Sequence, residues 1–361
     1  MTQPYRFYAA EISYFSGKVR PALRQKGVAF VEHLPTPAAY REVILPRTGL
    51  GFIPVVVTPD GDTWQDTSAI LDALEVRHPE PALYPPTPVQ RVVAYLVELY
   101  ADEFLVLPAM HYRWSFPEGV RKARGDFAAS NGDPAAAAKF ADRMGGSIRA
   151  LGVVPESIPP IEAHLADLLD ALSAHFAEHG ALLGSRMSLA DCALLGPFYA
   201  HLYLDLVPGL LLRERAPLVC HWIERMNHPD PGAPGAFLAG DALAPTLRPL
   251  LDLIGHDAVP LLLDGLRDFE RWADARPADL ETPPRATGFH ETSLRGAKFA
   301  RYTSPYALWM AQRTLDAYAA ADAAERAAID AALAGTGCEA LLAWRPRHRL
   351  GKRRFQLVFE R

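Results

Sequence analysis

The pattern of apolar and polar positions changes near residue 85 of the chain. Before that point, short runs of β-branched and aromatic residues predict strands, and one segment between them has helical spacing. The turn Asp60-Gly61-Asp62 favours a hairpin between the last two of these strands. The predicted strands are Tyr5–Ala10, Val28–Leu34, Val55–Thr58 and Thr63–Trp64, and the predicted helix runs from Ser16 to about Lys26.

After the proline-rich stretch 79–88, which predicts an interdomain linker, apolar positions recur at helical spacing. One long helix is expected from Val92 to Trp114 and another over Ile161–Phe176. Ser188 and Asp191 then precede the apolar run 192–204, which is a capping-box pattern with Asp in place of the usual Glu. We expect a small α/β domain over residues 1–86 and an all-α domain over residues 89–232.

Residues 233–361 form a third region, for which the pattern predicts both helices and strands. The segment Gly288–Trp309 is expected to be irregular, and Phe355–Phe359 alternates like a terminal strand. The final stretch from Arg345 is mostly basic, which indicates an exposed basic face, or a segment that docks on an acidic surface of a partner or of the same chain. The predicted helices are Leu247–Ile254, Val259–Ala275 and Ala323–Leu333.

Two features near residues 53–67 predict a ligand site. Pro54 opens the valine run 55–57, and proline, which has no N–H, is normally confined to the first residue of such a strand. A cis bond before Pro54 would leave the backbone of Ile53 available to an extended peptide. Asp66 and Thr67 predict a helix start, where free N–H groups favour a carboxylate. Together they predict a site for a small acidic peptide.

The segment from Ser13 to Arg20, Ser-Tyr-Phe-Ser-Gly-Lys-Val-Arg, lies between the first strand and the first helix. In this order with the Ile-Pro-Val-Val strand and the Asp66–Thr67 pair, it resembles the glutathione transferase superfamily over roughly residues 5–230. The resemblance implies a thioredoxin-like α/β N-terminal domain plus an all-α C-terminal domain, here followed by an additional α+β extension. It also implies glutathione as the bound thiol and a homodimer.

The resemblance assigns the catalytic role to Ser13, the first serine of the motif in the Ser-type classes. A hydroxyl at a helix N-terminus stabilises a thiolate through a hydrogen bond and the helix dipole. The alternative for Ser13 is a loop or capping serine, although we expect Ser16 to be the cap. Tyr14 and Tyr8 are further alternatives, because other classes use tyrosine. No cysteine precedes Cys192, which argues against the Cys-type classes.

The same resemblance places the rest of the glutathione site. Asp66 and Thr67 match the pair that grips the γ-glutamyl end, and Ile53 and Pro54 would face the cysteinyl backbone. Phe15 would pack beside the thiol. The alternative for Asp66 and Thr67 is helix capping alone.

One position departs from the family pattern. Phe52 stands where a lysine often helps to bind the glycyl carboxylate, and Arg41 and Arg47 are candidate replacements.

A second-substrate pocket would be formed in part by aromatic residues after position 110. His111, Tyr112 and Trp114 are candidates for its wall, although aromatic residues at such positions are also common in a core. Arg113 would either attract an anionic substrate or form a salt bridge.

Composition narrows the functional classes. The chain has 361 residues, a net charge of −5 and three cysteines, so a nucleic-acid partner and a disulfide framework are not expected. We find no signal pattern and no apolar run long enough for a membrane span, which favours the cytoplasm. No complete zinc-protease, P-loop or dinucleotide motif is present, so no metal is expected.

The sequence therefore predicts a cytoplasmic glutathione transferase that activates the glutathione thiol for attack on a small hydrophobic electrophile. Conjugation, ether cleavage, dehalogenation and isomerisation stay open as reactions. The alternative is a non-catalytic, glutathione-transferase-like binding or scaffold protein, which Phe52 and the basic extension favour. A third possibility is an activity that uses another thiol or none.

Overall fold

The computed structural model describes residues 3–360, which fold as two compact units. The first unit comprises Met1–Tyr84, Ala109–Gly146 and His179–Phe237, and the second comprises Pro85–Pro108, Ser147–Glu178 and Leu238–Arg361. Residues 89–232, expected to be one helical domain, contribute helices to both units. The boundaries 1–86, 89–232 and 233–361 stay a prediction.

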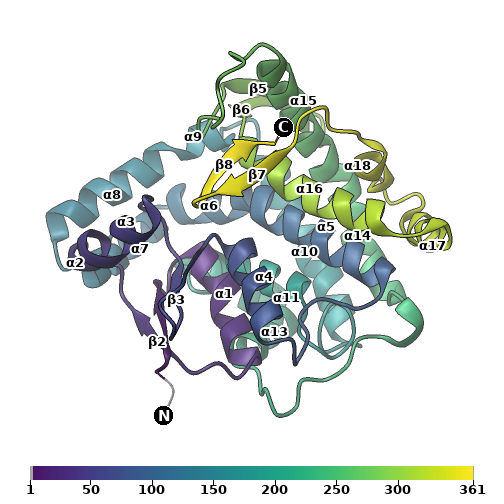
Figure 1. Ribbon diagram of the computed structural model, residues 1–361, viewed down its shortest axis with the longest axis horizontal. Helices are drawn as coiled ribbons and strands as arrows, with labels where there is room; N and C mark the ends of the chain where they lie inside the picture. The colour runs from purple at the N-terminus through teal and green to yellow at the C-terminus, as the bar shows by residue number, and fades with distance from the viewer. Residues whose placement is uncertain (1–2, 361) are drawn as a thin grey trace. The chain divides into compact units, whose positions relative to one another are not determined.

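The first unit contains a four-stranded sheet of order β2-β1-β3-β4. Figure 1 labels β2 and β3 of this sheet. β1 pairs in parallel with β2 and antiparallel with β3, which pairs antiparallel with β4. Helix α1 (Tyr14–Gln25) joins the two parallel strands, and α4 (Thr67–Arg77) follows the last strand. This is the expected thioredoxin-like arrangement. The strands are β1 (Tyr5–Tyr8), β2 (Phe30–His33), β3 (Val55–Val57) and β4 (Thr63–Gln65).

Helices complete the first unit. Short helical segments between β2 and β3 pack Ile44 into an apolar cluster with Tyr8, Val55 and Val57, and Ile53 lies against this cluster. The segments are α2 (Pro37–Ala39), η1 (Tyr40–Ile44) and α3 (Leu45–Thr48); the later helices are α6 (Val106–Trp114, from Ala109 onward), α7 (Pro117–Asn131), α8 (Pro134–Gly146), α11 (Leu189–Pro197), η2 (Phe198–Tyr203), α12 (Leu206–Arg215) and α13 (Pro217–Asn227).

Helix α11 begins with the predicted capping box. The Asp191 carboxylate accepts hydrogen bonds from the Ser188 N–H at 2.9 Å, the Leu182 N–H at 3.0 Å and the Trp222 Nε1–H at 3.2 Å. Burial raises the pKa of Asp191, and these hydrogen bonds oppose the rise. On the next turns, Gly196 packs against Tyr14, and a Cβ built on Gly17 would lie 3.2 Å from the Leu195 carbonyl oxygen. The close contact of α1 with α11 therefore depends on glycine.

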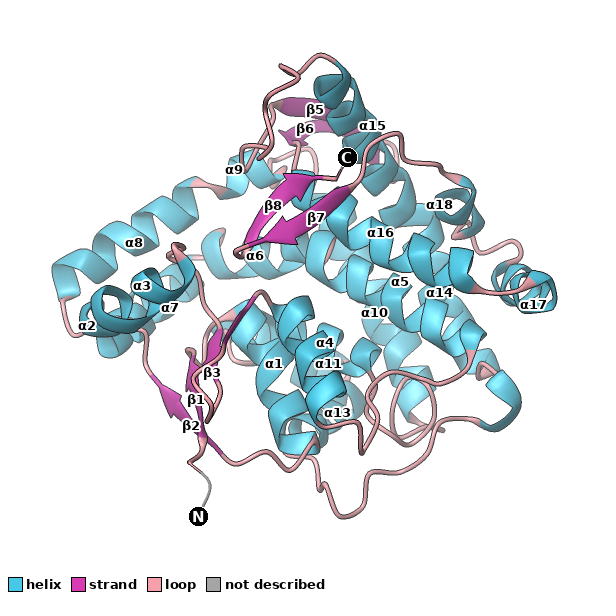
Figure 2. Ribbon diagram, viewed as in Figure 1, coloured by secondary structure: helices cyan, strands magenta, loops and turns pink. Residues whose placement is uncertain are grey.

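The second unit is α+β and contains two separate antiparallel hairpins, β5–β6 and β7–β8 (Figure 2). The strands and helices beyond residue 230 confirm the predicted mixed extension. Its elements are α5 (Pro88–Glu103), α9 (Ile148–Leu151), α10 (Ile158–Phe176), η3 (Ala239–Asp241), η4 (Pro245–Leu247), α14 (Arg248–Leu253), η5 (Ile254–Ala258), α15 (Val259–Asp274), β5 (Phe289–Leu294), β6 (Ala297–Tyr302), α16 (Pro305–Ala320), α17 (Ala323–Leu333), α18 (Glu339–Ala343), β7 (Leu350–Arg353) and β8 (Gln356–Phe359).

Two local predictions were wrong. The helix expected over Val92–Trp114 is two helices, broken after Glu103, because Pro108 has no N–H to donate to the Phe104 carbonyl. The segment 288–309 is the β5–β6 hairpin and the start of α16, not an irregular stretch. Polar His290 and Thr292 occupy the buried face of β5, which hid the strand pattern.

The basic C-terminal segment docks on acidic residues of the same unit. Arg347 pairs with Asp274 and Arg349 with Asp316, both at 2.7 Å. Arg353 also pairs with Glu281. Exposed pairs of this kind contribute little stability individually. The arginines of this segment stay exposed while they pair with acidic residues of the same chain, so the two interpretations are compatible.

Within residues 3–360, no single helix is both long and apolar enough to cross a membrane, although α11 with η2 and α12, bent by 108° between them, meets that test as a pair.

Candidate functional site

Ser13 is the N-cap of α1. Its backbone is extended, and its Oγ accepts a hydrogen bond from the Ser16 N–H at 3.3 Å. The prediction that Ser16 caps this helix was wrong. Ser16 is fully buried one turn later, where its Oγ accepts from the Ala10 N–H at 3.4 Å. The N-cap of α1 therefore lies three residues earlier than expected, at the end of the loop after β1.

This geometry leaves the Ser13 hydroxyl able to donate. Its oxygen accepts a backbone hydrogen bond, and among residues 3–360 its hydrogen has no acceptor. The hydroxyl also lies at the positive end of the α1 dipole, which favours a nearby anion. A thiolate placed against Ser13 would therefore receive both a hydrogen bond and a favourable electrostatic interaction.

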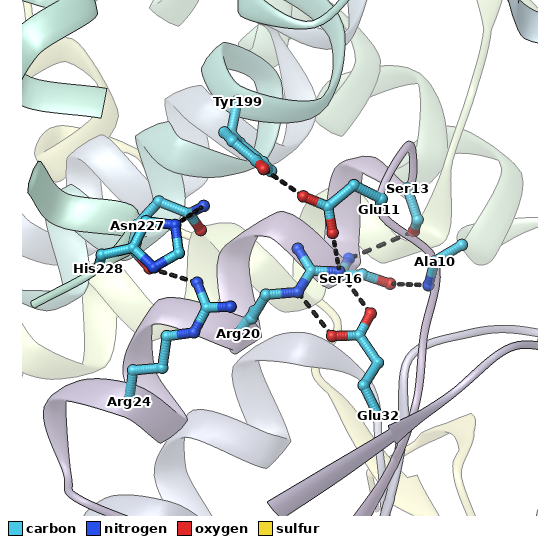
Figure 3. A network of polar contacts seen from close by, with 10 residues as sticks. All are labelled: Ala10, Glu11, Ser13, Ser16, Arg20, Arg24, Glu32, Tyr199, Asn227 and His228. Atoms are coloured by element: carbon cyan, nitrogen blue, oxygen red, sulfur yellow. Dashed lines mark hydrogen bonds and ion pairs between the residues drawn. The ribbon is translucent and has the colours of Figure 1, made fainter. Parts of the chain in front are cut away.

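Charged side chains hold the turn before α1 (Figure 3). Arg20 donates from Nε and Nη2 to both carboxylate oxygens of Glu32, at 2.8 and 2.7 Å, and lies 3.4 Å from Glu11. The Tyr199 hydroxyl donates to the Glu11 carboxylate, and burial together with this bond raises the pKa of Tyr199 to about 12. Arg20 therefore connects the loop, α1 and β2, and its role is structural.

The peptide between Ile53 and Pro54 is cis, and β3 begins at the next residue, Val55. The Ile53 side chain packs on the apolar cluster below the sheet. Phe15, at the start of α1, and Phe52 are exposed to similar extents, 38% and 39%. These exposed aromatic side chains, one near Ser13 and one next to Ile53, leave apolar surface for a ligand.

Asp66 and Thr67 start α4. Asp66 is the N-cap, its Oδ1 accepts from the Ala69 N–H at 3.2 Å, and its φ of 78° lies in a region that non-glycine residues rarely adopt. Thr67 is 4% exposed, and among residues 3–360 neither its N–H nor its hydroxyl has a hydrogen-bond partner. Backbone strain next to unused donors is typical of ligand sites. The N-terminus of α4 can hold a carboxylate.

A hydrogen bond of Lys18 joins α1 to the start of α4. Its Nζ donates to the Ser68 Oγ at 3.0 Å, and both side chains are fully buried. Lys18 lies in the first half of α1, and Ser68 lies in the first turn of α4. Lys18 belongs to the motif from Ser13 to Arg20, but the sequence predicted no role for it.

The three aromatic candidates for a second-substrate wall are buried. The Nδ1 of His111 is 2.9 Å from the Ser115 Oγ, and Tyr112 stacks on Phe116. Trp114 stacks on Phe127. His111, Tyr112 and Trp114 are 2%, 7% and 8% exposed, so the first unit uses them mainly for packing. Their assignment to a substrate pocket stays a prediction.

The two arginines considered as replacements at the Phe52 position have other partners. Arg41 pairs with Glu42 at 2.7 Å on the surface. Arg47 donates to the Gly61 carbonyl and to the Thr63 hydroxyl, each at 3.0 Å, and so fastens the turn between β3 and β4.

His201 was missed by the sequence analysis. It lies in the π-helix η2, 4% exposed, with its ring edge-on to Tyr14 at 5.3 Å. Its Nδ1 is buried and has no hydrogen-bond partner among residues 3–360. Burial, followed by the charges of Arg113 and Lys122, holds the pKa of His201 well below its usual range, so the imidazole is neutral at physiological pH. The apolar run 192–204 contains His201, and no motif in that run indicated a functional histidine.

Metal ligands are not clustered in the described part of the chain, residues 3–360, where no three His, Cys, Asp or Glu side chains could hold an ion together.

Comparison with protein families gives two matches. Residues 7–82 match the family described as glutathione S-transferase, N-terminal domain, and residues 162–230 match glutathione S-transferase, C-terminal domain. A search of the curated proteins found no match.

Several solved structures are similar to the chain. A glutathione S-transferase from Methylobacterium radiotolerans, in complex with glutathione sulfonate, is 24% identical; the match covers 67% of this chain and all of that one, with a TM-score of 0.40. The β-etherase LigF from Sphingobium sp. strain SYK-6 is 18% identical over 64% of this chain and 97% of its own, with a TM-score of 0.46. A glutathione S-transferase from Methylobacillus flagellatus with glutathione bound is 19% identical over 63% and 98%, with a TM-score of 0.39.

The sheet, the helices and the two domain matches define a protein with a thioredoxin-like N-terminal domain and a helical C-terminal domain, followed by further helices and strands. Residues 7–82 and 162–230 are therefore the N-terminal and C-terminal domains of the glutathione S-transferase superfamily.

Proposed function

We propose that the protein is a glutathione transferase in which Ser13 stabilises the glutathione thiolate. The observation that carries the proposal is the Ser13 hydroxyl at the N-cap of α1. Its oxygen accepts from the Ser16 N–H, so the hydroxyl hydrogen is not used in this bond and is available to a ligand. A buried or fully paired serine would offer no such donor.

The other residues of the site would hold the peptide. Thr67 offers an N–H and a hydroxyl to the γ-glutamyl carboxylate at the N-terminus of α4. Asp66 would attract the amino group, and the backbone of Ile53 before Pro54 would pair with the cysteinyl residue. Phe15 would cover the thiol from the α1 side.

The reaction needs the thiol to lose its proton near neutral pH. A free thiol with a pKa near 8.5 is only a few per cent ionised at pH 7, and lowering the pKa by two units takes about 2.7 kcal/mol of preference for the thiolate. The Ser13 hydroxyl and the α1 dipole are the sources of that preference. The thiol proton passes to solvent. A sulfur lone pair then forms the bond to an electrophilic carbon of a small hydrophobic substrate, and the leaving group departs with its bonding electrons.

Substitution of Ser13 tests the proposal, provided that its capping role is controlled. Ser13→Ala would remove the cap and cost about 0.5–2 kcal/mol, whereas glycine at an N-cap costs only a few tenths. We therefore choose Ser13→Gly, with Ser13→Thr as the variant that keeps a hydroxyl. The ultraviolet absorbance of bound thiolate, titrated against pH, gives the thiol pKa directly. We expect Ser13→Gly to raise this pKa by one to two units, and Ser13→Thr to raise it less.

Calorimetry with glutathione tests the binding site separately. Thr67→Ala removes a hydroxyl that makes no hydrogen bond within residues 3–360, so its effect on folding should be small. Weaker glutathione binding by this variant supports the assignment, and unchanged binding contradicts it.

The competing proposal is a binding protein without catalysis. It is favoured by Phe52, an exposed aromatic residue at a position where a cation would help to hold the glycyl carboxylate. A turnover assay distinguishes the two proposals. The binding protein would bind glutathione or another ligand but convert no electrophile, and Ser13→Gly would leave that binding unchanged.

The assembly and the compartment also belong to this proposal. We expect a homodimer, as the family resemblance implies, and a cytoplasmic location, in keeping with three buried cysteines that form no disulfide. Light scattering measures the first of these, and localisation of a tagged full-length chain measures the second.

A further inference from the structure

Arg113 on α6 connects three parts of the first unit. Its Nε donates to the Asp205 carboxylate at 2.7 Å, its Nη2 to the Ala200 carbonyl at 2.6 Å, and its Nη1 to the Ile12 carbonyl at 2.9 Å. The residue is 3% exposed. Each nitrogen of the guanidinium therefore has a buried partner, which leaves the side chain unsuited to attracting an anionic substrate.

The Ile12 carbonyl belongs to the peptide that joins Ile12 to Ser13. Rotation of this peptide changes φ at Ser13, and with it the direction in which the Ser13 hydroxyl points. The N–H of the same peptide, that of Ser13, donates a hydrogen bond of 3.1 Å to the Ala10 carbonyl. Arg113 binds the carbonyl oxygen of this peptide and Ala10 binds its N–H, so hydrogen bonds restrain the peptide plane at both edges.

The charge of Arg113 is balanced by Asp205, which is 1% exposed and also lies 3.5 Å from Lys122. The Asp205 carboxylate fixes the orientation of the Arg113 guanidinium plane. In this orientation Nη1 points at the Ile12 carbonyl oxygen. Lysine has a single nitrogen and no fixed plane, so it cannot bind Asp205, Ala200 and Ile12 at once.

We propose that Arg113 is a positioning residue for thiol activation: by holding the Ile12–Ser13 peptide it fixes the direction of the Ser13 hydroxyl. This inference rests on the proposed function of Ser13. It assigns no contact between Arg113 and glutathione. The effect of Arg113 should therefore appear in the pKa of the bound thiol and in kcat, much more than in the affinity for glutathione.

The test compares Arg113→Lys with Arg24→Lys in the full-length protein. Arg24 also donates to a backbone carbonyl, that of Asn227 at 2.5 Å, but this contact lies at the C-terminal end of α1, away from Ser13 (Figure 3). Three quantities are measured: the pKa of bound glutathione from thiolate absorbance, the Kd for glutathione by calorimetry, and the thermal midpoint.

We expect Arg113→Lys to raise the bound thiol pKa by about one unit, a tenfold fall in the ratio of thiolate to thiol, with the Kd changed less than about threefold. Arg24→Lys should leave the thiol pKa at the wild-type value even where it lowers the thermal midpoint. A folded Arg113→Lys protein with a wild-type thiol pKa would overturn the inference, as would an equal shift in both variants.

A second variant covers the case in which Arg113→Lys does not fold. Asp205→Asn keeps an oxygen acceptor for Arg113 but loosens the guanidinium plane, and it should give a smaller rise in the thiol pKa in the same direction. No rise in a folded Asp205→Asn protein would count against the inference. Failure of the proposed function looks different: the wild-type thiol pKa would then equal that of free glutathione, and Ser13→Gly would not change it.

Discussion

Lys18 donates a hydrogen bond of 3.0 Å to Ser68, and the contact joins α1, the helix capped by Ser13, to α4, the helix that begins at Thr67. Both side chains are fully buried. A buried ammonium group is costly unless it is hydrogen-bonded, so this pair is tightly restrained. The two helix N-termini of the proposed glutathione site therefore have a fixed separation before any ligand binds.

Removal of the acceptor should weaken both folding and binding. In Ser68→Ala the ammonium of Lys18 loses one buried partner, and we expect the free energy of unfolding to fall by about 1–3 kcal/mol. Glutathione should bind several-fold more weakly, because the first turn of α4 moves relative to α1. Urea unfolding and calorimetry measure the two effects. Ser130→Ala is the control, since the Ser130 hydroxyl donates to carbonyls of its own helix.

Asp66→Asn separates the capping role of Asp66 from its charge. Asparagine keeps an oxygen for the Ala69 N–H and tolerates a positive φ, so stability should change by less than about 0.5 kcal/mol. If the carboxylate faces the glutathione amino group, the Kd should rise by about ten- to a hundredfold, the loss expected for one charge-assisted hydrogen bond. A Kd equal to that of the wild type would leave capping as the role of Asp66.

Phe52→Lys should improve glutathione binding. Phe52 is 39% exposed, so a lysine there can reach solvent, and a surface ion pair with the glycyl carboxylate is worth about 0.2–1 kcal/mol. The expected gain is roughly two- to fivefold in Kd at low salt, and it should shrink as the ionic strength rises. Val76→Lys, at an 85% exposed position on α4, adds the same charge elsewhere. An equal gain in both variants would indicate a non-specific charge effect.

The sequence was sufficient for the sheet, the main helices and the capping box at Ser188, because each follows from a local pattern. It misplaced the cap of α1, where Ser13 and Ser16 are both plausible caps by residue type. The difference is decided by the length of the turn after β1, which depends on contacts from Arg20, Arg113 and Tyr199. Those contacts join residues that are far apart in the chain, and no local pattern announces them.

The same limit applies to the buried cations. Lys18, Arg20 and Arg113 each lie in helices where a charged residue is ordinarily exposed, and only the folded chain shows their partners. The aromatic residues after position 110 are a different case: residue type predicts a pocket wall, the side chains are buried, and their assignment to a pocket stays a prediction. Residue type therefore indicated the start of α4, whereas the partners of these buried cations became apparent only in the folded chain.

The three cysteines should be unreactive in the folded protein. Cys192, Cys220 and Cys338 are buried and free, and burial raises the pKa of each thiol, that of Cys338 to about 12. Because the thiolate is the reactive form, a chromogenic disulfide reagent at pH 8 should modify them at least about a hundredfold more slowly in the native than in the urea-unfolded protein. Rapid native modification would show that one of these sites opens.

His290 supplies a titration that should act on stability. Its Nδ1 lies 2.8 Å from the Thr303 Oγ1, and that hydroxyl donates to Asp268 at 2.6 Å, so Nδ1 carries the ring hydrogen. The Nε2 faces Gly265 of α15 and is buried, with no hydrogen-bond partner in the described part of the chain, residues 3–360. Burial, followed by the charge of Arg301, lowers the pKa of His290 to about 4 against partial opposition from Asp268 and Asp264.

The pKa of His290 is about 4 when folded and about 6.5 when unfolded, so the unfolded chain binds the extra proton first as the pH falls. The stability associated with neutral His290 is complete above pH 6.5 and is lost progressively between pH 6.5 and 4. His290→Asn keeps a donor for Thr303 and does not titrate. Its stability should therefore fall less steeply in this window, by about 1–2 kcal/mol once partial solvent screening is allowed for. Urea unfolding of both proteins at several pH values measures the two slopes; parallel curves would mean that His290 is protonated in the folded protein as readily as in the unfolded chain.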